Sequence, residues 1–314
     1  MTSQYNRHFS LKAEGSETID LSELRCRFEI HPRPGLVPRA CNVKITNLKE
    51  SLATKFVGQG REFTKITIEA GYEDHYAIVF KGNIVWGRYG KENPTDTVTE
   101  IWANDGDMGN NYATVNTTHK PGSTQADHLD TALQAMKQYG ITKGFIGIDL
   151  SQLKYPRAVT LYGMARDVIR SIAQSNSEVA YYENEKLNIV SAKGNVSGGI
   201  IKLNSTSGLI DKPVQTEEGI FARCLINPDI ALMKMVQIDQ KDIIQGSPTF
   251  DQIGNPIENV LADIATDGIY TVFKIDIVGD TRGQPWYYDL AMHAKGKVPL
   301  KSGLYTQFGD PSAT

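Results

Sequence analysis

The sequence predicts a mainly β protein with a small α/β unit inserted between two strand-rich segments. Three observations lead to this fold class. Short runs of alternating apolar and polar residues, broken by glycine and proline, fill residues 1–104 and return in 193–296. Helical spacing of apolar residues is found within 105–192. Finally, the heptapeptide VFKGNIV at 79–85 has a near copy, VFKIDIV, at 272–278, so each strand-rich segment holds one.

The first segment is predicted to contain several short strands. Leu24–Ile30 alternates apolar with charged residues, as a half-buried strand does. The stretch HPRPGLVP that follows contains three prolines and a glycine, which exclude both a helix and a regular ladder. Further strands are expected at 41–45, 66–70, 77–81, 84–87 and 97–102, with a polar turn at 71–74. This spacing favours a sandwich or a small barrel.

Two helices and a hairpin are predicted in the middle segment. Pro121–Thr124 supplies a helix start and Gly140 ends that helix. Between them, apolar residues fall on one helical face: Leu129, Ala132, Leu133 and Met136. A second amphipathic helix is expected to open at Thr160. A hairpin should follow, with strands at 179–183 and 187–190 around the turn 184–186. These elements define an α/β insert over 105–192.

Strands return after a glycine- and serine-rich stretch at 193–208. They are expected at 221–226, 235–238, 268–278 and 286–293, the last two forming a hairpin across 279–285. Residues 241–259 are predicted to be a loop and 297–314 an extended tail. In both segments the repeated heptapeptide is preceded by a strand and followed by a glycine, a polar turn and another strand. We therefore predict a duplicated β-barrel unit, with one barrel in 1–104 and the other in 193–296.

The composition is ordinary for a globular protein, with 40% hydrophobic and 22% charged residues. A net charge of −3 and the lack of a basic stripe argue against a protein whose main role is to bind nucleic acid. The sequence has no run of 18 apolar residues, so no membrane-spanning helix is expected. The N-terminus lacks the apolar region of a secretory signal peptide. Three widely spaced cysteines predict neither disulfides nor zinc, but small buried side chains: Cys26, Cys41 and Cys224.

No catalytic, cofactor or metal site is predicted. Asp105–Asn110 resembles a calcium loop, but Asn116 stands where a carboxylate is needed, so a capped turn is favoured. His119 and His128 have no standard metal spacing, and a solvated helix end explains them better. Two carboxylate pairs would suit acid–base chemistry, yet a solvated turn or strand face accounts for them more simply: Glu217 with Glu218, and Asp276 with Asp280.

One turn is a candidate partner interface. Asp280, Arg282 and Trp286 lie in or beside the turn after the second heptapeptide. Arginine and tryptophan are enriched among the residues that dominate binding energy at protein interfaces. Packing of these side chains at the end of a barrel is an equally good explanation.

Nine short motifs, taken in order, resemble the baseplate hub proteins of contractile phage tails, including the central hub of T-even phages. The resemblance is taken to cover residues from about 28 to about 294, and its motifs are VFKG at 79–82, TDTV at 95–98, ANDGD at 103–107, VNTT at 115–118, LYGMAR at 161–166, TEEGI at 216–220, RCLINP at 223–228, DGIY at 267–270 and GDTRG at 279–283. A relative from a non-contractile tail or a contractile bacteriocin would carry similar motifs.

The resemblance implies a structural virion protein with no enzymatic activity and no cofactor. Two tail-tube-like barrels would lie in each subunit, and three subunits would form a homotrimeric ring with pseudo-sixfold symmetry. Such a ring adapts a hexameric tail tube to a trimeric central spike, contacts other baseplate or tape-measure proteins, and lets genomic DNA pass without specific binding. The α/β insert would decorate the outside. Assembly would take place in the host bacterial cytoplasm.

A second function remains open from the residues alone. The carboxylates Glu218 and Asp280, together with the aromatic-rich strand Trp286–Tyr288, would suit a cell-wall-degrading or sugar-binding tail-tip protein, because aromatic rings stack on sugars.

Overall fold

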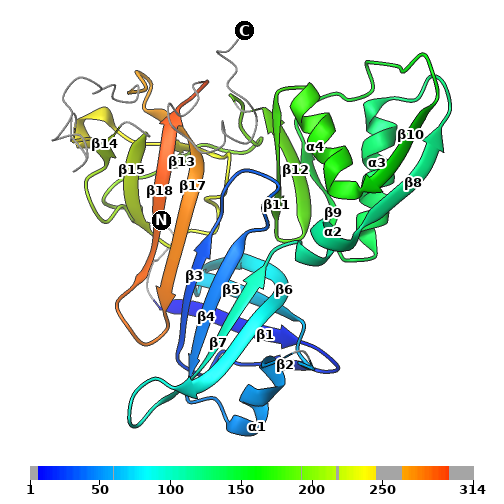
Figure 1. Ribbon diagram of the computed structural model, residues 1–314. Coiled ribbons are helices and arrows are strands. Elements are labelled where there is room, and N and C mark those ends of the chain that lie inside the picture. The colour runs from blue at the N-terminus through cyan, green and yellow to red at the C-terminus, as the bar shows by residue number, and fades with distance from the viewer. Residues whose placement is uncertain (1–5, 59, 192, 217–218, 245–263, 297–314) are drawn as a thin grey trace, which may run out of the picture.

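The computed structural model describes residues 6–58, 60–191, 193–216, 219–244 and 264–296 (Figure 1). Three features predicted from the sequence fall wholly or mostly outside these residues: the carboxylate pair 217–218, the loop 241–259 and the tail 297–314.

The first strand-rich half contains seven strands and two short helical turns. The strands are β1 Arg7–Glu14, β2 Thr18–Asp20, β3 Cys26–His31, β4 Ala40–Thr46, β5 Lys65–Tyr72, β6 His75–Lys91 and β7 Thr97–Asn104, and the turns are α1 Glu50–Ala53 and η1 Thr54–Phe56. Strands were predicted within β3, β4, β5 and β7, and these predictions are confirmed. Strand β1 was not predicted, although it pairs with β5 over its whole length.

The two strands predicted at 77–81 and 84–87 are in fact one strand, β6. Gly82 lies inside this strand. The backbone of Asn104 on β7 comes so close to it that a side chain at this position would collide. The strand bends at two bulges, where Val79 and Val85 have no partner in the ladders with β5 and β7. A bulge bends a strand and re-aims its side chains without ending it.

The second half contributes six strands to the same sheet. They are β13 Ile201–Lys202, β14 Val214–Gln215, β15 Ile220–Leu225, β16 Met235–Gln237, β17 Ile269–Asp280 and β18 Trp286–Ala294, with the turn η2 Gln240–Asp242. The predicted hairpin of the last two strands is confirmed. The main strand order is β14-β15-β18-β17-β3-β4-β7-β6-β5-β1-β2; β16 also pairs with β17, and β13 pairs with β16. Because β17 pairs with β3, one sheet runs through both halves; their division into two barrels stays a prediction.

The insert combines three helices with two small sheets (Figure 1). Its elements are α2 Asp107–Tyr112, β8 Thr114–His119, α3 Gln125–Lys137, β9 Thr142–Ile146, β10 Val159–Met164, α4 Ala165–Ser175, β11 Glu178–Glu183 and β12 Lys186–Ser191. The helix start at Thr124 is confirmed, since its side chain and that of Asp127 form a reciprocal capping box. The hairpin is also confirmed. Asn184 and Glu185 at its tip have φ values of 52° and 62°, as a tight hairpin turn requires.

The predicted start of the second helix at Thr160 is wrong. Thr160 lies in β10, which pairs antiparallel with β8, and α4 begins at Ala165. Gly163, with a φ of 127°, cannot belong to a right-handed helix. The apolar spacing from Leu161 onward therefore combined the end of a strand with the beginning of a helix, two structures that short apolar runs do not distinguish.

Two hydrophobic cores stabilise the molecule. The larger one spans both strand-rich halves, so that Phe28 and Phe80 share it with Ile277 and Trp286. The smaller lies in the insert between α3, α4 and the sheet of β9, β11 and β12. All three cysteines are buried and free, as predicted. None of the described helices is long and apolar enough to cross a membrane.

The burial of His293 in the second half can be tested through the pH dependence of stability. It is buried on β18 against Phe273, and neither ring nitrogen has a hydrogen-bond partner. Burial lowers the pKa of His293 to about 4, from 6.5. At this residue the unfolded chain binds a proton at a higher pH than the folded protein does. The free energy of unfolding should therefore fall as the pH drops from 6.5 toward 4, by up to about 3 kcal/mol. Between pH 7 and pH 4.5, urea unfolding should show a smaller loss of unfolding free energy for His293→Phe than for the wild-type protein. An equal loss in both proteins would contradict this assignment.

Candidate functional site

The residues predicted as a partner interface lie at the joint between the two strand-rich halves. Asp280, at the end of β17, is buried and accepts two hydrogen bonds from the Arg25 guanidinium, at 2.7 Å from Nη2 and 3.2 Å from Nε. It also accepts the backbone N–H of Arg282 at 2.9 Å. The hydrogen bond from Arg25 lowers the pKa of Asp280. A charged pair thus links the second half to the segment that precedes β3.

Trp286 contributes apolar packing to the same joint between the two halves. It is only 2% exposed, and its ring packs edge-on against Phe28 on β3 at 5.6 Å. The Arg7 guanidinium lies over the indole at 5.3 Å. Arg7 also donates to three carbonyls of the turn: those of Asp280, Gly283 and Gln284.

Of the three candidate residues, only Arg282 is exposed, and its guanidinium donates to the carbonyl of Glu23 at 3.0 Å. All three contact the first half of the same chain. Their role toward another chain stays a prediction.

Those residues considered for chemistry that the structure describes form no reactive constellation. Asp276 is paired separately from Asp280, with Arg33 at 2.6 Å and with His31 at 2.7 Å. Tyr288, like Trp286, is buried, so neither ring can stack on a sugar. Asp105, at the start of the calcium-like loop, instead accepts backbone N–H groups of the β11–β12 turn. Within the described residues, no three histidine, cysteine or acidic side chains are grouped to hold a metal ion.

His119 and His128 are closer together than their spacing suggested. Their ring centroids are 4.7 Å apart, and each Nε2 contacts a hydroxyl: Thr131 for His119 and Ser123 for His128. His128 is buried, so the prediction of a solvated helix end is wrong for this residue. It packs under Tyr155, whose position the local sequence pattern did not indicate.

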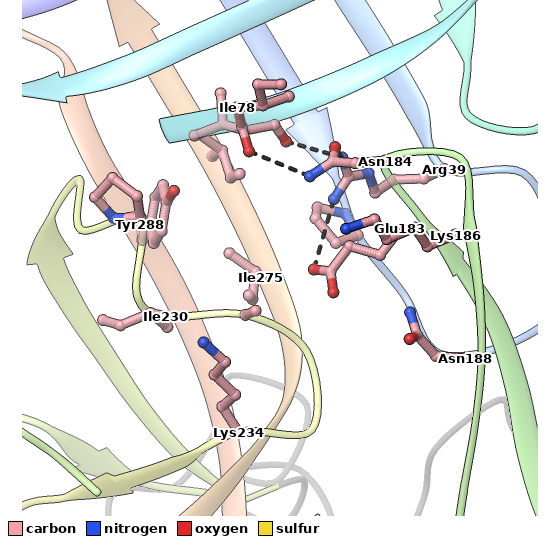
Figure 2. A pocket seen from close by; sticks show the side chains of 15 residues that line it. Arg39, Ile78, Glu183, Asn184, Lys186, Asn188, Ile230, Lys234, Ile275 and Tyr288 are labelled. Carbon is pink, nitrogen blue, oxygen red and sulfur yellow. Dashed lines mark hydrogen bonds and ion pairs between the residues drawn. The ribbon is translucent and has the colours of Figure 1, made fainter. Parts of the chain in front are cut away.

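A second joint fixes the insert to the first half (Figure 2). Arg39, just before β4, is buried and donates through Nη2 to the carbonyl of Val79 at 2.8 Å and to the side chain of Asn184 at 2.6 Å. Its Nε lies 3.7 Å from the buried carboxylate of Asp105. That carboxylate accepts the backbone N–H groups of Asn184 and Glu185, at 2.6 and 2.8 Å. One arginine and one aspartate thus hold the tip of the insert hairpin.

Glu185 completes this joint on its other side. Its carboxylate pairs with Lys65 on β5 and with Lys81 on β6, the second pair at 2.9 Å. Glu183 lies on the opposite side of the hairpin, 3.9 Å from Arg39. Burial raises the pKa of Glu183, with Arg39 opposing the shift.

A cavity of about 240 Å³ lies where the three parts of the chain meet (Figure 2). Arg39 and Ile78 line it from the first half, Glu183 from the insert, and Ile275 and Tyr288 from the second half. Its lining mixes charged and apolar side chains.

The sequence analysis did not single out Arg39, and it considered Asp105 only for calcium. Arg39 is a charged residue directly before a strand of alternating apolar residues, and Asp105 directly follows one. Most charged side chains in such positions are exposed, so the sequence contains no signal that these two are buried.

Replacing Asp105 tests the insert joint. Asp105→Asn keeps the shape but places an NH₂ group against one of two backbone N–H donors. We expect a loss of about 2–4 kcal/mol in the free energy of unfolding, since a buried charged network is broken. Asp167→Asn, in an exposed pair with Arg170 on α4, is the matched control and should cost under about 0.5 kcal/mol. Equal costs in urea unfolding would show that the joint does not stabilise the fold.

Replacing Asp280 tests the joint between the halves. Asp280→Ala should cost about 1–3 kcal/mol at pH 7, because it removes a buried carboxylate that accepts hydrogen bonds from Arg25 and from the backbone N–H of Arg282. The folded-state pKa of Asp280 is lowered, so its contribution is present above pH 3.8 and is lost as the pH falls through the folded value. Asp289→Ala, on β18 of the same hairpin, breaks a more exposed pair with Arg223 on β15 and should cost under about 1 kcal/mol. A cost for Asp280→Ala that does not change between pH 7 and pH 2.5 would contradict the pairing.

Comparison with known proteins gives the chain its family. A family model described as "Baseplate hub gp41" matches residues 37–241. No curated protein sequence matches.

Solved structures share the fold at 9 to 11% sequence identity. The 43 kDa tail protein of prophage MuSo2 from Shewanella oneidensis has 9% identity and a TM-score of 0.56, over 93% of this chain and 99% of that one. A tail protein from Neisseria meningitidis MC58 has 11% identity and a TM-score of 0.56, over 93% and 98%. The E. coli c3393 protein has 10% identity and a TM-score of 0.55, over 90% and 76%. It is described as a component of the type VI secretion system with structural similarity to the T4 tail proteins gp27 and gp5. The chain therefore belongs to the baseplate hub gp41 family of structural phage tail proteins.

Proposed function

We propose that three copies of this chain form a pseudo-sixfold ring that joins a hexameric tail tube to a trimeric central spike and leaves a channel for the genome. The observation that carries this proposal is a repeated strand order. VFKGNIV lies on β6 and VFKIDIV on β17. From these strands outward, the order is β6-β7-β4-β3 in one half and β17-β18-β15-β14 in the other, and all neighbours are antiparallel.

The flanking strands extend the correspondence. β5 pairs with the first part of β6, on the side away from β7. β16 pairs with the first part of β17, on the side away from β18. Each chain thus presents two similar units, and three chains present six. A subunit built this way suits an adaptor between sixfold and threefold partners.

Pseudo-symmetry requires the two units to keep a fixed orientation. The joint described above supplies it through the β17–β3 ladder, the Arg25–Asp280 pair and the packing of Trp286. The insert is tied to the rim of the first unit by Arg39 and Asp105. In this proposal it decorates the outside of the ring.

The side of the sheet opposite the core suits a channel wall. A row of charged side chains crosses it from β15 to β6, and four of its carboxylates have cationic partners: Asp289 with Arg223, Asp276 with Arg33 and Lys274, Asp280 with Arg25, and Glu100 with Lys44 and Arg88. Glu29 on β3 is exposed on the same face. Balanced charge lacks the basic surplus that holds DNA by counterion release. We therefore infer that this face lines the channel and lets DNA pass without specific binding.

The partners and the setting follow from this role. The ring would contact tail tube proteins on one side and the spike on the other, with further baseplate or tape-measure proteins nearby, after assembly in the host cytoplasm. The alternative of a sugar-binding or wall-degrading tail tip has weaker support, because Trp286 and Tyr288 are buried and Asp280 is occupied by Arg25.

The solution mass of the purified chain tests the ring. We expect a species of about 104 kDa by light scattering, three times the subunit mass of 34.7 kDa. Negative-stain images should show rings with a central hole. Co-expression with the tube and spike proteins should increase the fraction of rings. A monomer both alone and in co-expression would contradict the proposal.

A further inference from the structure

Each of the three parts contributes a positively charged side chain to the cavity where they meet. Arg39 comes from the first half, Lys186 from β12 of the insert, and Lys234 from the segment just before β16 of the second half. Among the described residues that line the cavity, Glu183 supplies the one carboxylate. Asp105 offsets a further charge from behind Arg39, at 3.7 Å. Three cations and two carboxylates leave one positive charge in surplus, and this surplus favours a negatively charged ligand.

Three buried hydrogen-bond donors on the cavity wall have no partner among the described residues. The Nη1 group of Arg39, which is 5% exposed, lies 3.9 Å from Glu183, too far for a hydrogen bond. Asn188, 7% exposed, accepts the backbone N–H of Phe145 through Oδ1 at 2.8 Å, so its NH₂ group is the end left without an acceptor. The hydroxyl of Tyr288, 2% exposed, also makes no hydrogen bond to this part of the chain. A buried donor without an acceptor is costly, so these groups indicate a ligand rich in acceptors.

Figure 2 shows these groups around a common space. The ammonium group of Lys234 points into it from the second half, and the amide of Asn188 faces it from β12. Lys234 donates one N–H to the carbonyl of Asp229 at 2.9 Å, which leaves two further N–H groups for a ligand. The cavity volume is about 240 Å³, whereas one water needs roughly 10–15 Å³. A small ion therefore fits together with several waters.

Glu183 indicates which anion the cavity suits. Sulfate carries no proton at pH 7, so it only accepts hydrogen bonds, and a neighbouring carboxylate repels it. Inorganic phosphate keeps at least one O–H group at pH 7, and this group can donate to a carboxylate. A phosphate monoester has mostly lost its last proton at pH 7, because its second pKa is about 6. Donors for several oxygens, beside one acceptor for an O–H group, thus match inorganic phosphate best.

We propose that the cavity binds one inorganic phosphate ion per chain. Arg39, Lys186 and Lys234 offset its charge, and the two uncharged donors described above bind its oxygens. Glu183 accepts the hydrogen bond from its O–H group. The bound ion then contacts side chains of all three parts, so it ties the insert to both halves. The proposal concerns a single chain and does not depend on the ring.

Equilibrium dialysis of the full chain against radiolabelled phosphate tests the site. At pH 7 and constant ionic strength, we expect saturable binding of one phosphate per chain. Unlabelled sulfate should compete at least about tenfold less well than unlabelled phosphate, because it has no O–H group for Glu183. Chloride should not compete measurably. The absence of saturable binding would mean a cavity filled by water alone, and equal competition by sulfate would mean that Glu183 does not select the ion; either result overturns the proposal.

Glu183→Gln tests the selection directly. The amide keeps the shape of the side chain and still accepts a hydrogen bond, but it carries no charge and can also donate to sulfate. Sulfate should therefore compete about tenfold better in this variant than in the wild-type chain, while phosphate binding is retained. An unchanged preference for phosphate would contradict the role assigned to Glu183.

Two further variants test whether the ion lies in this cavity. Lys186→Met removes a charge and should weaken phosphate binding about tenfold. Tyr288→Phe removes a hydroxyl and should weaken it about fivefold. It should not lower the urea midpoint in phosphate-free buffer, because that hydroxyl has no partner in the described part of the chain. The matched control is Lys143→Met on β9, whose ammonium group pairs with Asp130 on the insert surface, and it should bind phosphate as the wild type does. Equal affinity in all three variants would show that phosphate binds elsewhere and would overturn the proposal.

Discussion

The antiparallel pairing of β17 with β3 is the contact on which the rest of the architecture depends. It converts two similar groups of strands into one sheet and lets Phe28, Phe80, Ile277 and Trp286 share a single core. Without this ladder, each unit would expose a long row of unpaired backbone groups. The salt bridge to Asp280 and the packing of Arg7 on Trp286 then fix the angle between the units. Backbone pairing supplies the joint, and these side chains set its geometry.

The joint to the insert uses different physics. Arg39 and Asp105 are both buried, and bringing two charges out of water is costly. The cost is offset by directional bonds: two backbone N–H groups to Asp105, and a carbonyl and an amide oxygen to Arg39. Apolar packing of equal area would permit sliding, whereas these bonds are satisfied in one orientation of the hairpin. These bonds therefore fix the position of the insert relative to the first half.

The local elements were largely readable from the sequence. Alternation gave β3, β4 and β17, and the Thr124 cap gave α3, because these signals depend on near neighbours. The start of α4 was misplaced because strand β10 runs directly into the helix. The roles of Asp280 and Trp286 were harder to predict, since Arg25 and Phe28, their partners, lie more than 250 residues away in the sequence. Sequence pattern identified them as notable residues but not as the joint within the chain. The repeated heptapeptide was the most informative signal, because it linked local pattern to topology.

The sequence separation of this joint has a consequence for synthesis. Arg25 and Asp280 are 255 positions apart, and Arg7 must reach carbonyls still later in the chain. During translation, the first unit emerges with the edge of β3 uncovered and stays so until β17 has left the ribosome. Contacts this distant close slowly and leave partly made chains prone to associate through exposed edges. Completion of the second half is therefore also the step that covers the exposed backbone edge of β3.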